Sequence, residues 1–197
     1  MPASVRTLTL ADAALPRADF LRNALLIMGA SVMTALAAQI AIPLPWTPVP
    51  VTGQSFAVLL TGMVLGSRRG FLALVLYLAE GAAGLPVFAG GGAGAALLLG
   101  PTGGYLIAFP LAAALTGFLA ERSWDRRLLS TLAAMLIGSS VIFAGGLAWL
   151  ARFVPPDQLL VTGLIPFIPG DVVKALLAAL AFPFAWDRIN RRSGIDA

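Results

Sequence analysis

The chain has 197 residues, of which 59% are hydrophobic and only 11% are charged, and its mean hydropathy is +0.91. Because a soluble globular domain carries about a quarter charged residues, this composition excludes an ordinary water-soluble fold. The sequence contains no cysteine and no histidine, which excludes disulfides, thiolate or imidazole metal sites and histidine-based catalytic triads. The net charge of +4 comes from arginines in short clusters between apolar runs, so we expect it to orient the chain in a membrane rather than to bind nucleic acid.

Apolar runs recur along the chain, and several are long enough to cross a hydrocarbon core of about 30 Å. In chain order, the predicted spans are residues 20–42, 55–66, 70–84, 105–120, 128–150 and 159–186. The last run contains Pro166 and Pro169, so its main helix is expected to begin at Gly170. The sequence therefore predicts an all-α integral membrane protein with six transmembrane helices.

The segments between the spans differ in composition. Residues 42–53 hold four prolines and no charge, and we expect a rigid outer loop or cap there. Residues 67–70 are expected to form a tight turn, and residues 121–128 and 152–158 to form loops. Residues 85–105 are uncharged and Gly-rich but lack the phosphate-loop pattern, so we expect a folded loop over a pocket, with a flexible outer loop as the alternative.

The arginine positions give the expected orientation. With both termini in the cytoplasm, eleven of the twelve arginines lie on the cytoplasmic side and only Arg152 lies outside, as the positive-inside rule requires. Residues 1–19 lack the apolar core of a signal peptide and are expected to be a cytoplasmic tail. Residues 20–187 are then a single membrane domain, and residues 188–197 are a second cytoplasmic tail. The expected location is the cell membrane, with several spans in contact with lipid.

Three ionisable residues fall well inside predicted spans, namely Glu80, Asp171 and Lys174. A charge at the bilayer centre costs about 2.5–3.5 kcal/mol on insertion scales, so such residues usually face a partner or a cavity. Asp171 and Lys174 share one helix face, in a first turn where free backbone N–H groups favour anionic groups. We expect this pair to bind a small polar molecule that carries both N–H and oxygen groups. The alternative is an internal ion pair, or a lysine that reaches the membrane surface.

Other polar residues near the span ends have competing interpretations. Glu80 is expected to pair with a neighbour or to lie near the membrane surface, with a direct ligand role as the alternative. Tyr77, one turn earlier, would present its hydroxyl either to a cavity or to the membrane interface. Gln39 and Gln54 flank the proline-rich loop and are expected to satisfy backbone groups there.

Ala30, Thr34 and Ala38 in the first span have the four-residue spacing of small residues that lets helices pack closely. This face is expected to serve either internal packing or the docking of another membrane subunit. The sequence does not separate these two interpretations.

Four motifs taken together resemble the BioY family, the biotin-binding S components of energy-coupling-factor (ECF) transporters. They are TPVPVT (47–52), GLPVFAGG (84–91), GPTGGY (100–105) and PGDVVK (169–174), in the family's order. The resemblance implies a six-helix S-component-like bundle with a Gly/Pro-rich outer loop cap, and a biotin pocket near the outer face that is roofed by the loop between the first and second spans. It also implies a transmembrane T component and two cytoplasmic ATPases as partners, with no cofactor apart from biotin as the transported ligand.

In that family the aspartate and lysine of the last motif contact the vitamin, and here they are Asp171 and Lys174. Biotin offers two ureido N–H groups, a ureido oxygen, an apolar thioether ring and a valerate carboxylate. Asp171 would accept from an N–H group, and Lys174 would donate to an oxygen. Further candidate contacts are residues of the pocket wall and of the loop after VFA. Some family members carry polar side chains in that loop, and in this chain backbone groups would substitute for them. These candidates are Trp46, Tyr77, Phe88, Gly91 and Tyr105.

Three alternatives remain open from the sequence. The chain is an S component for another vitamin, a membrane-embedded enzyme with Asp171 as acid or base, or a scaffold subunit without a ligand. No paired catalytic carboxylate, histidine or cysteine accompanies the motif, so we expect no catalytic residue, no metal site and no enzymatic activity.

Overall fold

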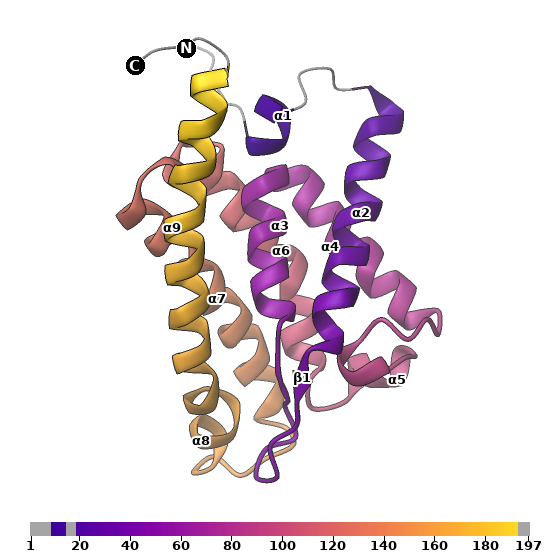
Figure 1. Cartoon of the computed structure of the whole chain (residues 1–197). Helices are drawn as coiled ribbons and strands as arrows, with labels where there is room; N and C mark the ends of the chain where they lie inside the picture. The colour runs from indigo at the N-terminus through magenta and orange to yellow at the C-terminus, as the bar shows by residue number, and fades with distance from the viewer. Residues whose placement is uncertain (1–8, 15–18, 193–197) are drawn as a thin grey trace, which may run out of the picture.

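The computed structural model describes residues 9–14 and 19–192, and most of these residues are helical (Figure 1). The long helices are α2 (Phe20–Gln39), α3 (Gln54–Leu65), α4 (Ser67–Ala82), α6 (Gly103–Ala120), α7 (Leu128–Leu150) and α9 (Ile168–Arg192). The short helices are α1 (Leu10–Ala14), η1 (Ala89–Gly91), α5 (Ala95–Leu99), η2 (Trp124–Arg126), α8 (Leu159–Gly163) and η3 (Ile165–Phe167). Strands β1 (Ala41–Ile42) and β2 (Val51–Thr52) pair antiparallel in a small hairpin.

Within the described residues, four helical segments are long and apolar enough to cross a membrane. They are Phe20–Gln39, Gly103–Ala120, Leu128–Leu150 and Leu159–Arg191, and Gln54–Leu65 is a shorter apolar helix. Large apolar side chains such as Leu25, Met33 and Leu177 are exposed along α2 and α9. Such an apolar exterior suits lipid rather than water. The prediction of a helical membrane protein with several spans is therefore confirmed.

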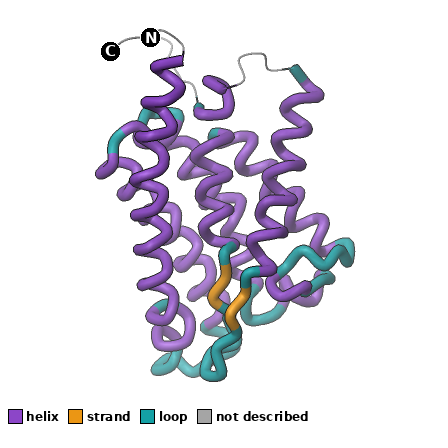
Figure 2. Tube along the Cα trace, viewed as in Figure 1, coloured by secondary structure: helices purple, strands orange, loops and turns teal. Residues whose placement is uncertain are grey.

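The two ends of the bundle differ in structure. The hairpin β1–β2, the loops around α5, and α8 gather at one end, which we call the pocket end (Figure 2). The helix α1 and the C-terminal end of α9 lie at the opposite end, which we call the terminal end (Figure 1). Strands are found only at the pocket end among the described residues, where irregular backbone is also concentrated (Figure 2).

The reversal between α3 and α4 occurs at one residue. Gly66 has a φ of 86°, a conformation that favours glycine, and α4 begins immediately after it. Glu121, at the end of α6, accepts hydrogen bonds from the backbone N–H and the hydroxyl of Ser67, both at 2.8 Å. This carboxylate satisfies the exposed start of α4, so residues 67–70 are helical. The prediction of a tight turn over residues 67–70 is wrong for this reason.

Both predicted tails contain helix. In the N-terminal tail, α1 packs against α3, and Thr9 and Ala11 are buried. At the other terminus, α9 continues to Arg192, past the expected domain boundary at residue 187. It begins at Ile168 rather than Gly170, because Pro169 fits the first helical turn, where no backbone N–H donor is needed. The parts of the tails at residues 1–8, 15–18 and 193–197 lie outside the described residues.

Helix α6 is the centre of the bundle and packs against α3, α4 and α7. Its small residues Ala112, Ala113 and Thr116 are fully buried. A Cβ atom at Gly62 of α3 would lie 2.1 Å from the carbonyl oxygen of Ala113, so the two backbones are in direct contact. Small residues therefore allow the close helix packing that membrane proteins use in place of a hydrophobic driving force.

The small-residue face of α2 lies inside the chain. Ala30, Thr34 and Ala38 are buried, and α2 packs against α4 along its length. The hydroxyl of Ser31, on the same face, donates a hydrogen bond to Glu80 of α4. The burial of these residues within the chain fits the alternative of internal packing.

Charged contacts hold the terminal end. Arg69 of α4 contacts Asp12 of α1, with 2.6 Å between Nη1 and Oδ1, and the Thr9 hydroxyl donates to the same carboxylate. Burial alone would raise the pKa of Asp12, but the hydrogen bonds from Arg69 and Thr9 outweigh it and lower that pKa. Asp125 of η2 is fully buried and accepts a 2.6 Å hydrogen bond from the Trp186 indole of α9. Burial raises the pKa of Asp125 despite that bond.

Candidate ligand-binding site

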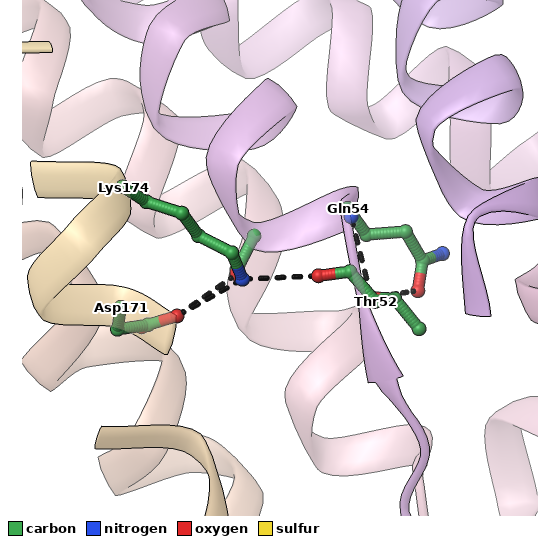
Figure 3. A network of polar contacts seen from close by, with 5 residues as sticks. Thr52, Gln54, Asp171 and Lys174 are labelled. Carbon is green, nitrogen blue, oxygen red and sulfur yellow. Dashed lines mark hydrogen bonds and ion pairs between the residues drawn. The ribbon is translucent and has the colours of Figure 1, made fainter. Parts of the chain in front are cut away.

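Asp171 and Lys174 lie in the first turns of α9 and face the junction of β2 and α3 (Figure 3). The Lys174 ammonium is 3.1 Å from Asp171 Oδ1. It also donates to the Thr52 carbonyl oxygen at 3.0 Å and to the Ser55 hydroxyl at 2.8 Å. An ammonium group has three N–H donors, and three acceptors are in place. The pair is therefore held between two segments that are more than a hundred residues apart in the sequence.

The two oxygens of Asp171 are used differently. Oδ1 accepts from Lys174 and, at 3.3 Å, from the Ser55 hydroxyl. No residue of the described ranges donates a hydrogen bond to Oδ2. Because Asp171 is only 7% exposed and lines a cavity, Oδ2 is an unused acceptor in a largely water-excluded place. Such an oxygen suits a ligand that brings its own N–H group.

The cavity beside this pair has a volume of about 270 Å³ and is partly open. Its lining comes from the hairpin, the start of α3, the η1–α5 segment, and helices α6, α7 and α9. The larger apolar side chains in its wall are Phe88, Leu97, Tyr105, Leu106, Phe109, Ile142, Phe143 and Phe167. An apolar cavity with a few convergent polar groups is the usual form of a small-molecule site.

Phe88 is fixed in the wall from behind. Its ring packs edge-on against Tyr77, with centroids 5.6 Å apart, and lies directly over Gly81. A Cβ atom at Gly81 would come within 2.1 Å of the Phe88 ring, so only glycine leaves room for it there. Tyr105, in the opposite wall, donates a 2.7 Å hydrogen bond from its hydroxyl to the Gly163 carbonyl. The structure thus places Phe88 and Tyr105 in the cavity wall, as predicted.

Tyr77 is not part of the cavity wall. It is fully buried, and its hydroxyl accepts a hydrogen bond from the Gln54 amide and donates one of 2.9 Å to the Val87 carbonyl. Protein partners occupy its hydroxyl, so the structure does not bring Tyr77 into the cavity wall. Tyr77 instead positions Gln54 and the Val87–Phe88 segment, both beside the cavity.

Two further predicted contacts lie outside the cavity. Trp46 sits in the hairpin turn and is 59% exposed, and Gly91 is exposed and has a φ of 79°. Neither residue lines the cavity. The structure therefore does not bring Trp46 or Gly91 into the cavity wall, and their contact with a ligand stays a prediction.

Three polar wall residues beside the Asp171–Lys174 pair were not predicted as ligand contacts, and neither was Thr102 at the start of α6. Thr52, Gln54 and Ser55 line the cavity beside Asp171 and Lys174. Gln54 was expected only to satisfy backbone groups, but its side chain bonds to Tyr77 and to the Thr52 hydroxyl. The TPVPVTGQS run ends a rigid segment at the start of a helix, and this was the available signal for them.

The other polar residues near the site are satisfied within the protein. Glu80 accepts from Ser31 and does not line the cavity, which confirms that it pairs with a neighbour. Gln39 donates to the carbonyls of Ala35, at 2.9 Å, and of Phe88, at 3.4 Å. Its expected role in satisfying backbone groups is thus confirmed.

The hairpin is tied to the opposite side of the cavity. The Thr47 hydroxyl donates a 2.7 Å hydrogen bond to the Thr162 carbonyl of α8. Trp149 of α7 donates from its indole to the Gly100 carbonyl at 3.0 Å, which anchors the chain before α6. These neutral donors hold irregular backbone over the cavity by satisfying its carbonyl groups. No group of three or more possible metal ligands occurs within the parts of the chain that the structure describes.

Comparisons with known proteins agree on one family. The model of the BioY family matches residues 6–191. A probable biotin transporter BioY from Pyrococcus horikoshii is 45% identical over 148 residues, which are 75% of this chain and 86% of that protein. The biotin transporter BioY from Thermotoga maritima is 41% identical over 158 residues, which are 78% and 91% of the two chains. A crystal structure at 2.1 Å of the S-component for biotin from an ECF-type ABC transporter matches with a TM-score of 0.74 and 28% identity, over 85% of this chain and 92% of that one.

Proposed function

The chain belongs to the BioY family, and we propose that it is the biotin-binding S component of an ECF-type transporter. Its function is the uptake of biotin, and it is a transport protein rather than an enzyme. The observation that carries this proposal is the cavity that joins an Asp171–Lys174 pair to an apolar wall.

The chemistry of biotin matches this cavity. A ureido N–H group would donate to the unused Oδ2 of Asp171, and the ureido oxygen would lie near the Lys174 ammonium. The thioether ring would pack against Phe88, Tyr105 and Phe167 in the apolar wall. Desolvation would strengthen the polar contacts, because they form in a place with little water.

In the membrane, all six long helices cross the bilayer with both termini in the cytoplasm. The arginine distribution supports this orientation, and it places the pocket end outside. The hairpin and the Gly-rich segment then form the outer roof of the cavity. Helices α3 and α4 are short for a full span, and their packing against α6 shields their ends from lipid.

Transport requires energy from partners. We assign a transmembrane T component and two cytoplasmic ATPases to this role, as in the ECF arrangement. Biotin would bind at the outer face and would be released inside when the ATPases drive a conformational change.

The test is calorimetric titration of the detergent-purified protein with biotin and with an unrelated vitamin. Saturable binding of biotin alone is expected. Asp171→Asn should weaken it about tenfold to hundredfold, because a hydrogen bond to a charged group contributes about 1.5–3 kcal/mol. The matched control is Asp187→Asn, an exposed aspartate on the same helix that pairs with Arg191. No binding by a folded sample, or equal effects of the two variants, would contradict the assignment.

A further inference from the structure

We propose that the site recognises only the ureido head of biotin and leaves its carboxylate end unrecognised. The chain therefore also binds biotin whose carboxyl is joined to another group, such as biotin amides and biotinyl-lysine. This inference rests on the proposed function and adds a ligand class to it.

The first observation is the charge of the cavity wall. Among the described residues that line the cavity, Asp171 and Lys174 are the only charged ones, and they pair with each other. The wall therefore carries no net charge. A ligand with a neutral polar head matches it, whereas the carboxylate of biotin would be an additional, unpaired negative charge.

The second observation concerns Lys174. Its three donors are already directed at Asp171 Oδ1, the Thr52 carbonyl and the Ser55 hydroxyl, at 2.8–3.1 Å. A ligand carboxylate on this ammonium would displace one of these acceptors. It would also stand next to the Asp171 carboxylate, and like charges at that distance repel. A neutral ureido oxygen would also have to share or replace one of these acceptors, but it would not repel the Asp171 carboxylate.

The third observation is the absence of charged residues in the segments that cover the cavity. Residues 40–66 and 81–120, which include the hairpin and the Gly-rich segment, contain no charged residue in the sequence. Arg152 is not in the cavity wall, and its guanidinium lies 4.3 Å from the ring centroid of Trp149. A carboxylate enclosed under this roof would lack a cation, which costs several kcal/mol.

The wall also holds neutral donors, among them the Thr102 hydroxyl at the start of α6, which makes no side-chain cap bond to that helix. Neutral donors do not replace a cation for a desolvated carboxylate. We therefore place the valerate end toward the opening, in contact with water. An amide or an ester at that end removes a negative charge for which the cavity wall provides no cationic partner.

The experiment compares the affinities of biotin, N-methyl biotinamide, biotinyl-lysine and 2-iminobiotin for the purified full chain. The first three should bind within about threefold of one another, a difference of less than 1 kcal/mol. 2-Iminobiotin, which lacks the ureido oxygen, should bind about tenfold or more weakly, because it loses a hydrogen bond to a charged donor. Thr102→Val should change the affinities for biotin and its amide by the same factor.

The contrary results are distinct. If biotin binds but both amides are weaker by about a hundredfold, the wall holds the carboxylate, and this inference is wrong while the proposed function stands. The same follows if Thr102→Val weakens biotin alone. If biotin itself does not bind to folded protein, the proposed function fails and this inference fails with it.

Discussion

The pocket end and the terminal end of the molecule are stabilised by different chemistry. At the terminal end, charged side chains make the contacts between elements, as in Asp12 with Arg69 and Glu121 with Ser67. At the pocket end, neutral donors such as Thr47 and Trp149 bond to backbone carbonyls, and the loops carry almost no charge. Among the residues that line the cavity, only the Asp171–Lys174 pair is charged.

This difference shows how a polar ligand can be selected in an apolar setting. Neutral contacts hold the roof without placing a competing charge near the site. The single ion pair then provides the main electrostatic feature of the cavity, and it leaves Asp171 Oδ2 as an unused acceptor. A charge in a charge-free region is thus a stronger sign of function than a charge among many others.

The largest expected effect is the loss of Lys174. Lys174→Gln removes the charged donor proposed for the ureido oxygen and also leaves Asp171 as an unpaired charge, so biotin affinity should fall at least about a hundredfold. The control is Arg188→Gln on the same helix, where the guanidinium lies over Phe184 at the terminal end. Calorimetric titration measures both. Similar losses in the two variants would contradict the special role of the pair.

A smaller loss is expected from Tyr77→Phe. The variant keeps the ring contact with Phe88 but removes the bonds to Gln54 and Val87, each of which contributes about 0.5–1.5 kcal/mol. Biotin affinity should fall about tenfold because the wall is less well positioned. Trp46→Phe, an exposed position outside the cavity, should leave affinity unchanged. A larger effect at Trp46 than at Tyr77 would reverse the assignment of these two aromatic residues.

The smallest effects are expected at the terminal end, on stability as a function of pH. The lowered pKa of Asp12 means that its contribution is present above about pH 4 and is lost as the pH falls further. Relative to wild type, Asp12→Asn should therefore lose melting temperature as the pH rises from about 3 to 5.

Asp125 should behave in the opposite way. Its pKa is raised, so its contribution is present at low pH and is lost as the pH rises through the pKa of the folded state. Asp125→Asn keeps an oxygen for the Trp186 indole and should gain melting temperature relative to wild type as the pH rises. Thermal unfolding in detergent at several pH values measures both variants, and the same sign for both would contradict the assigned environments.

Much of the helical layout could be predicted from the sequence. Apolar runs bounded by proline, glycine or arginine gave residues 128–150 with the bounds that α7 has. The Asp171–Lys174 pair was visible because charges are costly in an apolar run. Gly66 shows the limit, because the helical state of the next residues depends on Glu121, more than fifty positions away.

The rest of the site depends on tertiary contacts that composition does not encode. Thr52 contributes a backbone carbonyl, which any residue carries, and only the fold brings it to Lys174. Tyr77 and Trp46 are both plausible wall residues by type. In the structure, Tyr77 is buried behind the cavity wall, and Trp46 is exposed in the hairpin turn. The small face of α2 fits either a neighbour in the chain or a partner, and in the structure it packs against α4.

The most direct test of the central claim is the structure of the chain with biotin bound. The account predicts the ureido ring within hydrogen-bonding distance of Asp171 Oδ2, the thioether ring against Phe88 and Tyr105, and the valerate chain directed to the opening of the cavity. Biotin bound elsewhere, or bound with its carboxylate on Lys174, would contradict it.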